Sequence, residues 1–122
     1  MVIRLHGNNM ARRYWLLARP GILRILVILY EHGPMPIHRI PRYGIGVGTT
    51  YRSAREAAML GLINLFYCGN SKCAKLTEQG LRVAEKIEEL LKVLEELNLV
   101  EPLQPVLKTE GSKEVESFEE PV

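Results

Sequence analysis

The chain has 122 residues, which is enough for one domain built around a single hydrophobic core. Its longest apolar run, Ile25–Tyr30, is far shorter than the roughly 20 residues that span a bilayer, and its N-terminus lacks the apolar region of a signal peptide. Only two cysteines are present, too few for the disulfide framework of a small secreted protein. These features predict a cytoplasmic protein without a membrane anchor.

The charge is divided unevenly along the chain. Residues 1–75 contain eleven Lys or Arg and two Glu, whereas residues 76–122 contain five Lys or Arg and twelve Glu. A basic half of this kind favours a polyanionic partner such as nucleic acid. An unevenly charged surface without such a partner is the alternative.

The first half of the chain reads as three helices. Asn8 or Asn9 is placed to cap a helix over about residues 10–19. A second helix, Pro20–His32, is apolar on nearly every side, which is typical of a helix at the centre of a domain; Gly33 is placed to end it in the left-handed conformation. Met35–Pro36 predicts a minimal strand, and a short helix follows around Ile37–Tyr43.

The second half reads as a helix, a hairpin and a long helix. A flexible glycine turn over residues 44–48 precedes the helix Thr49–Leu60, whose apolar face is narrow and consists of Thr50, Ala54, Ala57 and Ala58. The segment Leu62–Cys68 predicts a strand, residues 69–72 predict a hairpin loop, and Cys73–Leu76 predicts the return strand. Thr77 is placed to cap a helix that runs to about Asn98.

Apolar residues recur in this last helix at spacings of 4, 3, 4 and 3, the pattern of a coiled-coil seam. The seam consists of Val83, Ile87, Leu90, Leu94 and Leu97. It predicts a dimer interface. Residues 99–122 hold three prolines and six Glu against two Lys, so we expect a folded domain over residues 1–98 and an acidic, disordered tail over residues 99–122.

Three stretches, in this order, resemble the PadR/MarR-like winged helix-turn-helix regulators. They are ILRILVILYEHGPM (22–35), GTTYRSAREAAMLGLI (48–63) and KLTEQGLRVAEKI (75–87), and the resemblance extends over Ile22–Leu97. It implies a mainly α-helical fold with a small β-hairpin wing and with dimerisation helices at both termini. The implied function is double-stranded DNA binding and transcription regulation by a homodimer. The chain departs from the family pattern in three ways. Pro41 lies within the expected positioning helix, the wing is very short, and Met59 and Leu60 occupy positions that are usually charged.

In such a domain the helix Thr49–Leu60 enters the major groove of DNA. Arg52 and Arg55 project side by side, and a guanidinium group can read the edge of guanine with two hydrogen bonds. The predicted DNA contacts are Thr49, Tyr51, Arg52, Ser53 and Arg55 on this helix, Arg39, Arg42 and Tyr43 before it, and Lys72 and Lys75 on the wing. Tyr14 and Trp15 are interpreted as dimer packing in preference to base stacking.

Cys68 and Cys73 bracket the hairpin loop and are expected to face each other across it. Two free thiols, a structural or redox-sensing disulfide, and a metal site all remain open. The metal site is the least favoured of the three and no metal ligand is assigned, because two cysteines with four residues between them and no nearby histidine are a poor zinc pattern.

No enzyme is predicted, and no cofactor. The Gly44–Gly48 segment has the spacing of neither a dinucleotide-binding nor a P-loop motif, and the basic half of the chain lacks paired carboxylates. The alternative function is a winged-helix module that binds another protein without specific DNA binding. The operator sequence, any small-molecule effector, and the choice between activation and repression do not follow from the sequence.

Overall fold

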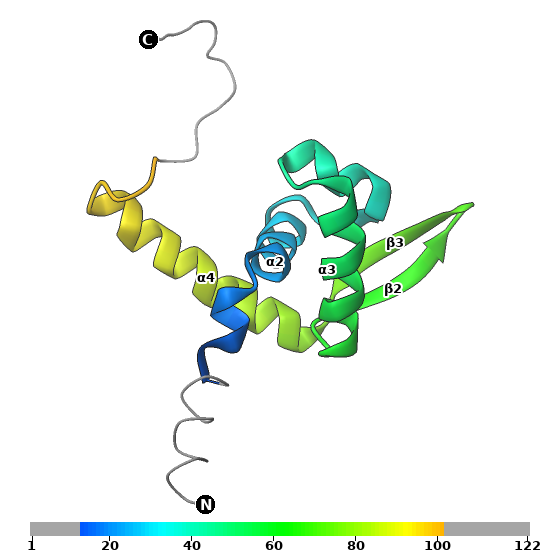
Figure 1. Cartoon of the computed structure of the whole chain (residues 1–122), viewed down its shortest axis with the longest axis horizontal. Coiled ribbons are helices and arrows are strands. Elements are labelled where there is room, and N and C mark those ends of the chain that lie inside the picture. Colours follow the sequence, from blue (N-terminus) through cyan, green and yellow to red (C-terminus); the bar gives the residue numbers. More distant parts are fainter. Residues whose placement is uncertain (1–12, 102–122) are drawn as a thin grey trace, which may run out of the picture. The chain divides into compact units, whose positions relative to one another are not determined.

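The computed structural model describes residues 13–101 (Figure 1). The elements are η1 (Leu16–Ala18), α2 (Pro20–His32), β1 (Met35–Pro36), η2 (Ile37–Tyr43), α3 (Val47–Met59), β2 (Ile63–Cys68), β3 (Ser71–Leu76) and α4 (Glu78–Glu96). Residues 13–15 are helical and lead into η1; the start of the predicted N-terminal helix and most of the predicted tail lie outside the described residues. By its contacts the chain divides within α4, after Glu89.

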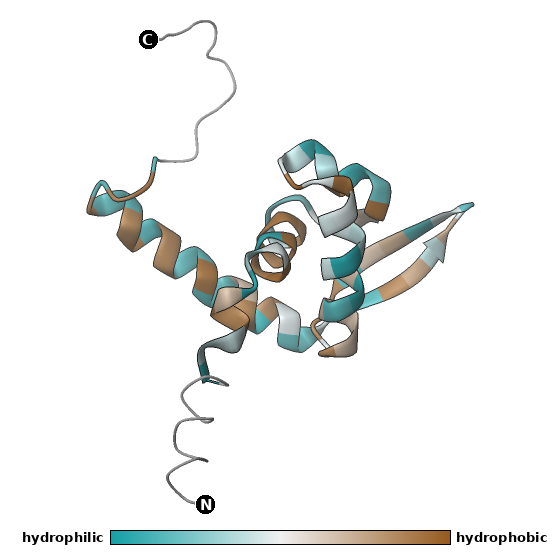
Figure 2. Ribbon diagram, viewed as in Figure 1, coloured by the Kyte–Doolittle hydropathy of each residue, from teal (hydrophilic) through white to brown (hydrophobic). Residues whose placement is uncertain are grey.

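Helix α2 is the centre of the larger unit. Pro20 occupies its first turn, where the missing N–H is harmless. The helix is hydrophobic along most of its length (Figure 2). Its buried residues are Ile22, Ile25, Leu26, Ile28 and Leu29. Gly33 ends the helix with a positive φ of 82°, but its ψ of −178° lies outside the left-handed helical region that we expected.

The predicted short helix Ile37–Tyr43 has these bounds, but it is a 3₁₀ helix. Because a 3₁₀ helix has three residues per turn, Ile37 and Ile40 share one face, and both are buried. Pro41 fits here because its fixed φ suits the turn. Gly44 closes the element by donating a hydrogen bond from its N–H to the Pro41 carbonyl at 3.0 Å, and its φ of 102° favours glycine.

Helix α3 begins at Val47, two residues earlier than predicted. The Thr50 hydroxyl donates to the carbonyl of Gly46 at 2.9 Å, which ties the first turn to the preceding residue. The buried face consists of Thr50, Ser53, Ala54 and Ala57, at the i, i+3, i+4 and i+7 positions of one helical stripe.

Helices α2 and α3 approach closely at Gly21. A methyl group at this position would overlap the Ser53 hydroxyl oxygen and lie 3.1 Å from Thr49 Cγ2. The prediction that Ser53 is exposed for DNA contact is therefore wrong, since this side chain is 5% exposed. Its small size, not its polarity, suits it to a tight helix–helix contact.

The strands form one antiparallel sheet in the order β1-β3-β2. Cys68 pairs with Ser71, so the hairpin turn consists of two residues, Gly69 and Asn70, and not of four as predicted. Gly69 has a φ of 69°, as tight hairpin turns require. Ser71 and Lys72 therefore belong to the return strand.

The hairpin leads into α4 through Thr77. Its hydroxyl donates to the Gly61 carbonyl at 2.6 Å and accepts the N–H of Gly80 at 3.0 Å, which confirms the predicted helix cap. Gly80 packs directly on the backbone of Leu62, the residue before β2. A methyl group at position 80 would overlap the carbonyl oxygen of Leu62.

The first half of α4 packs on the core of its own chain. Ala84 is fully buried, and Val83 and Ile87 pack against the core cluster. Val83 and Ile87 are half-buried in this contact, so less of these two side chains is exposed than the predicted dimer seam requires. Their spacing satisfies an amphipathic helix equally well, and the a/d pattern cannot by itself tell an internal face from an external one.

The segment after Glu89 presents apolar side chains to solvent. Leu90 is 54% exposed and Leu97 61% exposed, and Val93 between them is also exposed, whereas Leu94 is half-buried. The helix ends after Glu96, and the N–H of Leu99 donates to the carbonyl of Leu94 at 2.8 Å. No helix within residues 13–101 has the length and hydrophobicity to span a membrane.

Candidate nucleic-acid interface

The outward face of α3 is the largest part of the candidate interface. Positions on one side of the helix are exposed in a regular helical period, opposite the stripe that packs on α2. They are Val47, Gly48, Tyr51, Arg52, Arg55 and Met59. Thr49 is only half-exposed because its methyl group lies near Gly21. Of the five residues predicted on this helix, Tyr51, Arg52 and Arg55 are on the outward face.

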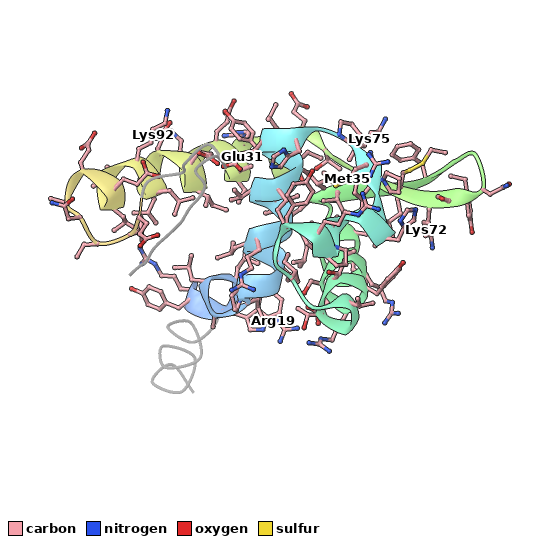
Figure 3. The ribbon with its side chains drawn as sticks, turned by 90° about the horizontal axis from the view of Figure 1, so that it is seen from above. Arg19, Glu31, Met35, Lys72, Lys75 and Lys92 are labelled. Atoms are coloured by element: carbon pink, nitrogen blue, oxygen red, sulfur yellow. A yellow bond between two sulfur atoms is a disulfide. The ribbon has the colours of Figure 1, made fainter. Side chains whose placement is uncertain are left out.

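The two arginines of this face keep their positive charge uncompensated. Neither Arg52 nor Arg55 forms an ion pair or a hydrogen bond with any residue of the part of the chain that the structure describes. Glu56, the one acidic residue of α3, pairs instead with Arg19, which precedes α2. The labelled Arg19 lies beside the start of α2 (Figure 3). This ion pair leaves the guanidinium groups of α3 available to an anionic partner.

Helix η2 adds a second group of basic side chains next to α3. Arg39 and Arg42 are three residues apart, so they lie on one side of the 3₁₀ helix, and both are exposed. The ring of Tyr43 stacks on that of His32, with centroids 4.3 Å apart and an interplanar angle of 27°. Tyr43 is thereby fixed at the end of η2 while its side chain stays 42% exposed.

The two lysines of the wing lie on opposite faces of the hairpin. Lys72 pairs with Tyr67 and Lys75 pairs with Asn64, and their odd spacing puts them on different sides, as Figure 3 shows. Lys72 shares its face with Ala74, which is part of the core. Lys75 extends over the ring of Phe66, with Nζ 5.4 Å from the ring centroid. The two lysines therefore do not form one surface with each other.

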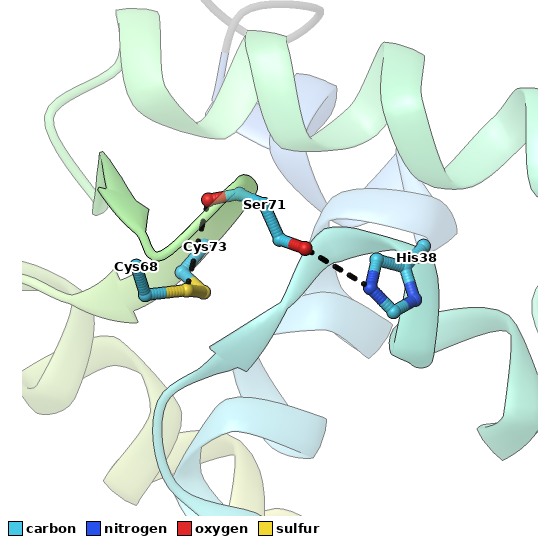
Figure 4. The surroundings of a disulfide bond; sticks show 4 residues. All are labelled: His38, Cys68, Ser71 and Cys73. Atoms are coloured by element: carbon cyan, nitrogen blue, oxygen red, sulfur yellow. Dashed lines mark hydrogen bonds between the residues drawn. A yellow bond between two sulfur atoms is a disulfide. The ribbon is translucent and has the colours of Figure 1, made fainter.

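A disulfide joins Cys68 to Cys73 across the hairpin (Figure 4). The two cysteines are not directly opposed, because Cys73 pairs with Phe66; they lie on a diagonal with their Cα atoms 6.0 Å apart. Near it, Ser71 Oγ is 3.5 Å from His38 Nε2, which links the hairpin to η2. The disulfide and this contact thus both lie near the turn of the hairpin.

Tyr14 and Trp15, the predicted dimer residues of the N-terminal helix, are both exposed. The guanidinium of Arg19 lies 5.4 Å from the centroid of the Trp15 ring. Within the described residues neither aromatic ring belongs to the core cluster. They are thus available for contact with another molecule.

Two exposed side chains near this interface were absent from the sequence-based prediction. Val47 was assigned to the glycine turn, because three glycines surround it. Tyr67 is 75% exposed and lies opposite Lys72; it was counted only as a strand-forming residue. The helical position of Val47 could have been predicted from Gly46, because glycine is favoured at the N-cap and Gly46 is the N-cap residue of α3.

Solved structures of other proteins share this fold. The chain is similar to AF1382 of Archaeoglobus fulgidus, with a TM-score of 0.58, 19% identity, and coverage of 68% of this chain and 97% of the other. It is similar to NMB1585, a MarR family regulator of Neisseria meningitidis (TM-score 0.58, 18% identity, coverage of 80% and 72%). It is also similar to MepR, a transcription regulator of the multidrug efflux pump MepA of Staphylococcus aureus, with a TM-score of 0.57, 16% identity, and coverage of 80% of this chain and 79% of the other.

No model of a known protein family matches the chain, and no curated protein sequence does. The structural similarities, at under 25% identity, concern the fold. The chain therefore has the winged helix-turn-helix fold of MarR-like proteins, in which α2, η2 and α3 form the helical part and β2–β3 forms the wing.

Proposed function

We propose that the protein is a transcription regulator that binds specific sequences of double-stranded DNA as a homodimer. The observation that carries this proposal is the outward face of α3, which presents Arg52 and Arg55 without an ion-pair partner. In helix-turn-helix proteins the second helix of the motif enters the major groove, which is wide enough for an α-helix. An exposed pair of unpaired guanidinium groups is suited to guanine edges and to phosphates.

The surroundings of α3 support the same proposal. Arg39, Arg42 and Tyr43 of η2 are exposed beside it and are suited to phosphate contacts, which supply half or more of the hydrogen bonds in such complexes. Lys72 of the wing adds a salt-sensitive attraction to the DNA backbone. The single ion pair formed by Glu56 keeps negative charge away from this face.

A homodimer is proposed from the exposed apolar side chains of Tyr14, Trp15, Leu90 and Leu97, together with half-buried Leu94. Exposed apolar groups of this kind are typical of subunit interfaces. The similar structures from Neisseria meningitidis and Staphylococcus aureus are described as regulators, which agrees with a role in transcription. A dimer with two-fold symmetry would bind a palindromic site whose half-sites are about 10 base pairs apart, or a multiple of that.

The test uses Arg52→Ala and Arg55→Ala on an operator obtained by repeated selection from random duplexes. Each variant should fold normally, because neither side chain packs in the core. Each should weaken operator binding by about 1–3 kcal/mol if the arginine reads a base, with relaxed discrimination at one position of each half-site. Arg82→Ala, an exposed arginine of α4, is the matched control and should bind like the wild type. If the double variant Arg52→Ala/Arg55→Ala binds the operator like the wild type, α3 is not the recognition helix.

The second candidate function is a protein-binding module. Met59, 79% exposed at the end of α3, and exposed Leu60 favour it, because they add apolar surface where a DNA backbone would pass. Retention on a column of immobilised duplex DNA distinguishes the two functions. A DNA-binding protein elutes with a steep dependence on salt concentration, whereas a protein-binding module passes through at low salt.

A further inference from the structure

Val47 is an exposed apolar side chain that the fold does not use. It is the first residue of α3 and is 63% exposed. Within the described residues it neither belongs to the core cluster nor packs against it. Valine is also a poor choice for an exposed helical position, because its β-branched side chain loses rotamer freedom there. Its presence therefore needs a reason outside the folding of this domain.

The residues on both sides of Val47 leave it protruding alone. Gly46 and Gly48 carry no side chains, and a methyl group added at either position would meet no atom within 4 Å. Neither glycine has a positive φ, so the backbone does not require glycine at these two positions. A molecule that binds at the start of α3 would thus contact the Val47 side chain and the backbone of the two glycines.

Val47 shares the outward face of α3 with the proposed DNA-reading residues. Tyr51 lies one turn further along and Arg55 two turns further along the same side of the helix. The N-terminal part of a recognition helix is the part nearest to the base edges. Valine has no hydrogen-bonding group, and the apolar group that DNA presents in the major groove is the C5-methyl group of thymine.

We infer that Val47 is a specificity-determining residue that recognises the 5-methyl group of a thymine in each half-site. This inference rests on the proposed function and names one of the bases that the protein reads. The contact removes the valine methyl groups and the thymine methyl group from water together, and it discriminates thymine from cytosine and from uracil at that position.

The experiment compares thymine with uracil, which differ by this methyl group alone. Operators are selected from random duplexes, and each should contain a thymine at one constant position of each half-site. Replacement of that thymine by uracil should weaken binding of the wild type about fourfold per half-site, the effect of one buried methylene-sized group. Val47→Ala should bind the thymine operator about as weakly as the wild type binds the uracil operator.

The decisive readout is the thymine-to-uracil ratio of each variant. Val47→Ala should bind thymine and uracil operators equally, whereas the control Leu81→Ala, an exposed apolar residue of α4 outside the candidate interface, should keep the fourfold ratio of the wild type. Equal binding of both operators by the wild type would overturn the inference, as would a fourfold ratio that persists in Val47→Ala. In either case the Arg52 and Arg55 variants still report on the proposed function, because their effect does not depend on the thymine methyl group.

Discussion

The pairing of Arg19 with Glu56 determines which arginines α3 offers to a partner. Glu56 lies one turn after Arg52, at a spacing at which the two side chains could pair with each other. In the structure Arg19 takes that position instead, and both partners are partly buried. Arg19 is not part of α3, yet its ion pair with Glu56 thus affects the charge of the proposed reading face.

Removal of Arg19 should therefore weaken operator binding indirectly. In Arg19→Ala, Glu56 is free to pair with Arg52, and an exposed pair of this spacing is worth about 0.5 kcal/mol, or roughly a twofold loss of affinity. The double variant Arg19→Ala/Glu56→Ala should regain that affinity, as measured by fluorescence anisotropy on a labelled operator. If the double variant binds as weakly as the single one, Arg19 contacts DNA itself.

Gly48 has a different relation to stability and to binding. It lies in the first turn of α3 with open space around its Cα, and its φ suits an L-residue. Gly48→Ala should raise the free energy of unfolding by about 0.5 kcal/mol, because alanine restricts the unfolded chain. The same methyl group would hold the helix away from the groove, so operator binding should weaken. Thermal unfolding and binding measured on the same sample check this; unchanged or tighter binding would show that Gly48 does not approach DNA.

Among the elements, those with large apolar residues, or with proline or glycine at their ends, could be predicted from the sequence. Pro20 and Gly33 mark the ends of α2, and the β-forming residues after Gly61 mark the hairpin. The start of α3 was missed because glycines favour turns in sequence, whereas here Gly48 is helical. Ser53 was predicted to be exposed because a hydroxyl group is usually found at the surface. It is buried because α2 approaches α3 closely at Gly21.

The long helix α4 shows a second limit of sequence patterns. A single apolar repeat runs through it, yet Val83 and Ile87 pack internally while Leu90 and Leu97 are exposed. The repeat indicates that these side chains form one apolar face of the helix, which suits contact with another surface. It cannot report whether that surface belongs to the same chain, because this depends on how far the core extends along the helix.

The proposed dimer should depend on the exposed part of that repeat. Leu90→Glu together with Leu97→Glu should give a folded monomer, because both side chains are exposed and their replacement leaves the core intact. Light scattering after size-exclusion chromatography gives the mass. Lys92→Glu, which adds negative charge to the same stretch, should remain dimeric. A wild-type protein that is monomeric at micromolar concentration would contradict the proposal.

The hairpin cross-link predicts a measurable redox dependence. Thiol titration of the denatured protein should detect no free thiol before reduction. After reduction it should detect two. Loss of this short covalent loop should lower the free energy of unfolding by about 2 kcal/mol. Thermal unfolding of the oxidised and reduced wild type, with Cys68→Ala/Cys73→Ala as the control that no longer responds to reductant, measures the difference. Two titratable thiols before reduction would contradict the prediction.

At the scale of the whole molecule, opposite charges are held on one chain. Residues 102–122 contain five Glu and two Lys, so their removal raises the formal net charge from +2 to +5. We expect the truncated protein to bind non-operator DNA more tightly, with little change in melting temperature. Anisotropy titrations on a duplex without an operator check the first expectation and calorimetry the second. A large fall in melting temperature would show that this segment is part of the folded structure.

The packing of Gly80 on the Leu62 carbonyl limits how this protein can evolve. Any other side chain at position 80 would push Leu62 and the start of α4 apart. A library of substitutions at this position should therefore retain glycine under any selection that requires folding. Gly48 would behave in the opposite way. Selection for heat resistance alone should replace it, and selection for DNA binding should restore it. The two glycines would thus separate, in one mutational experiment, the demands of folding from those of recognition.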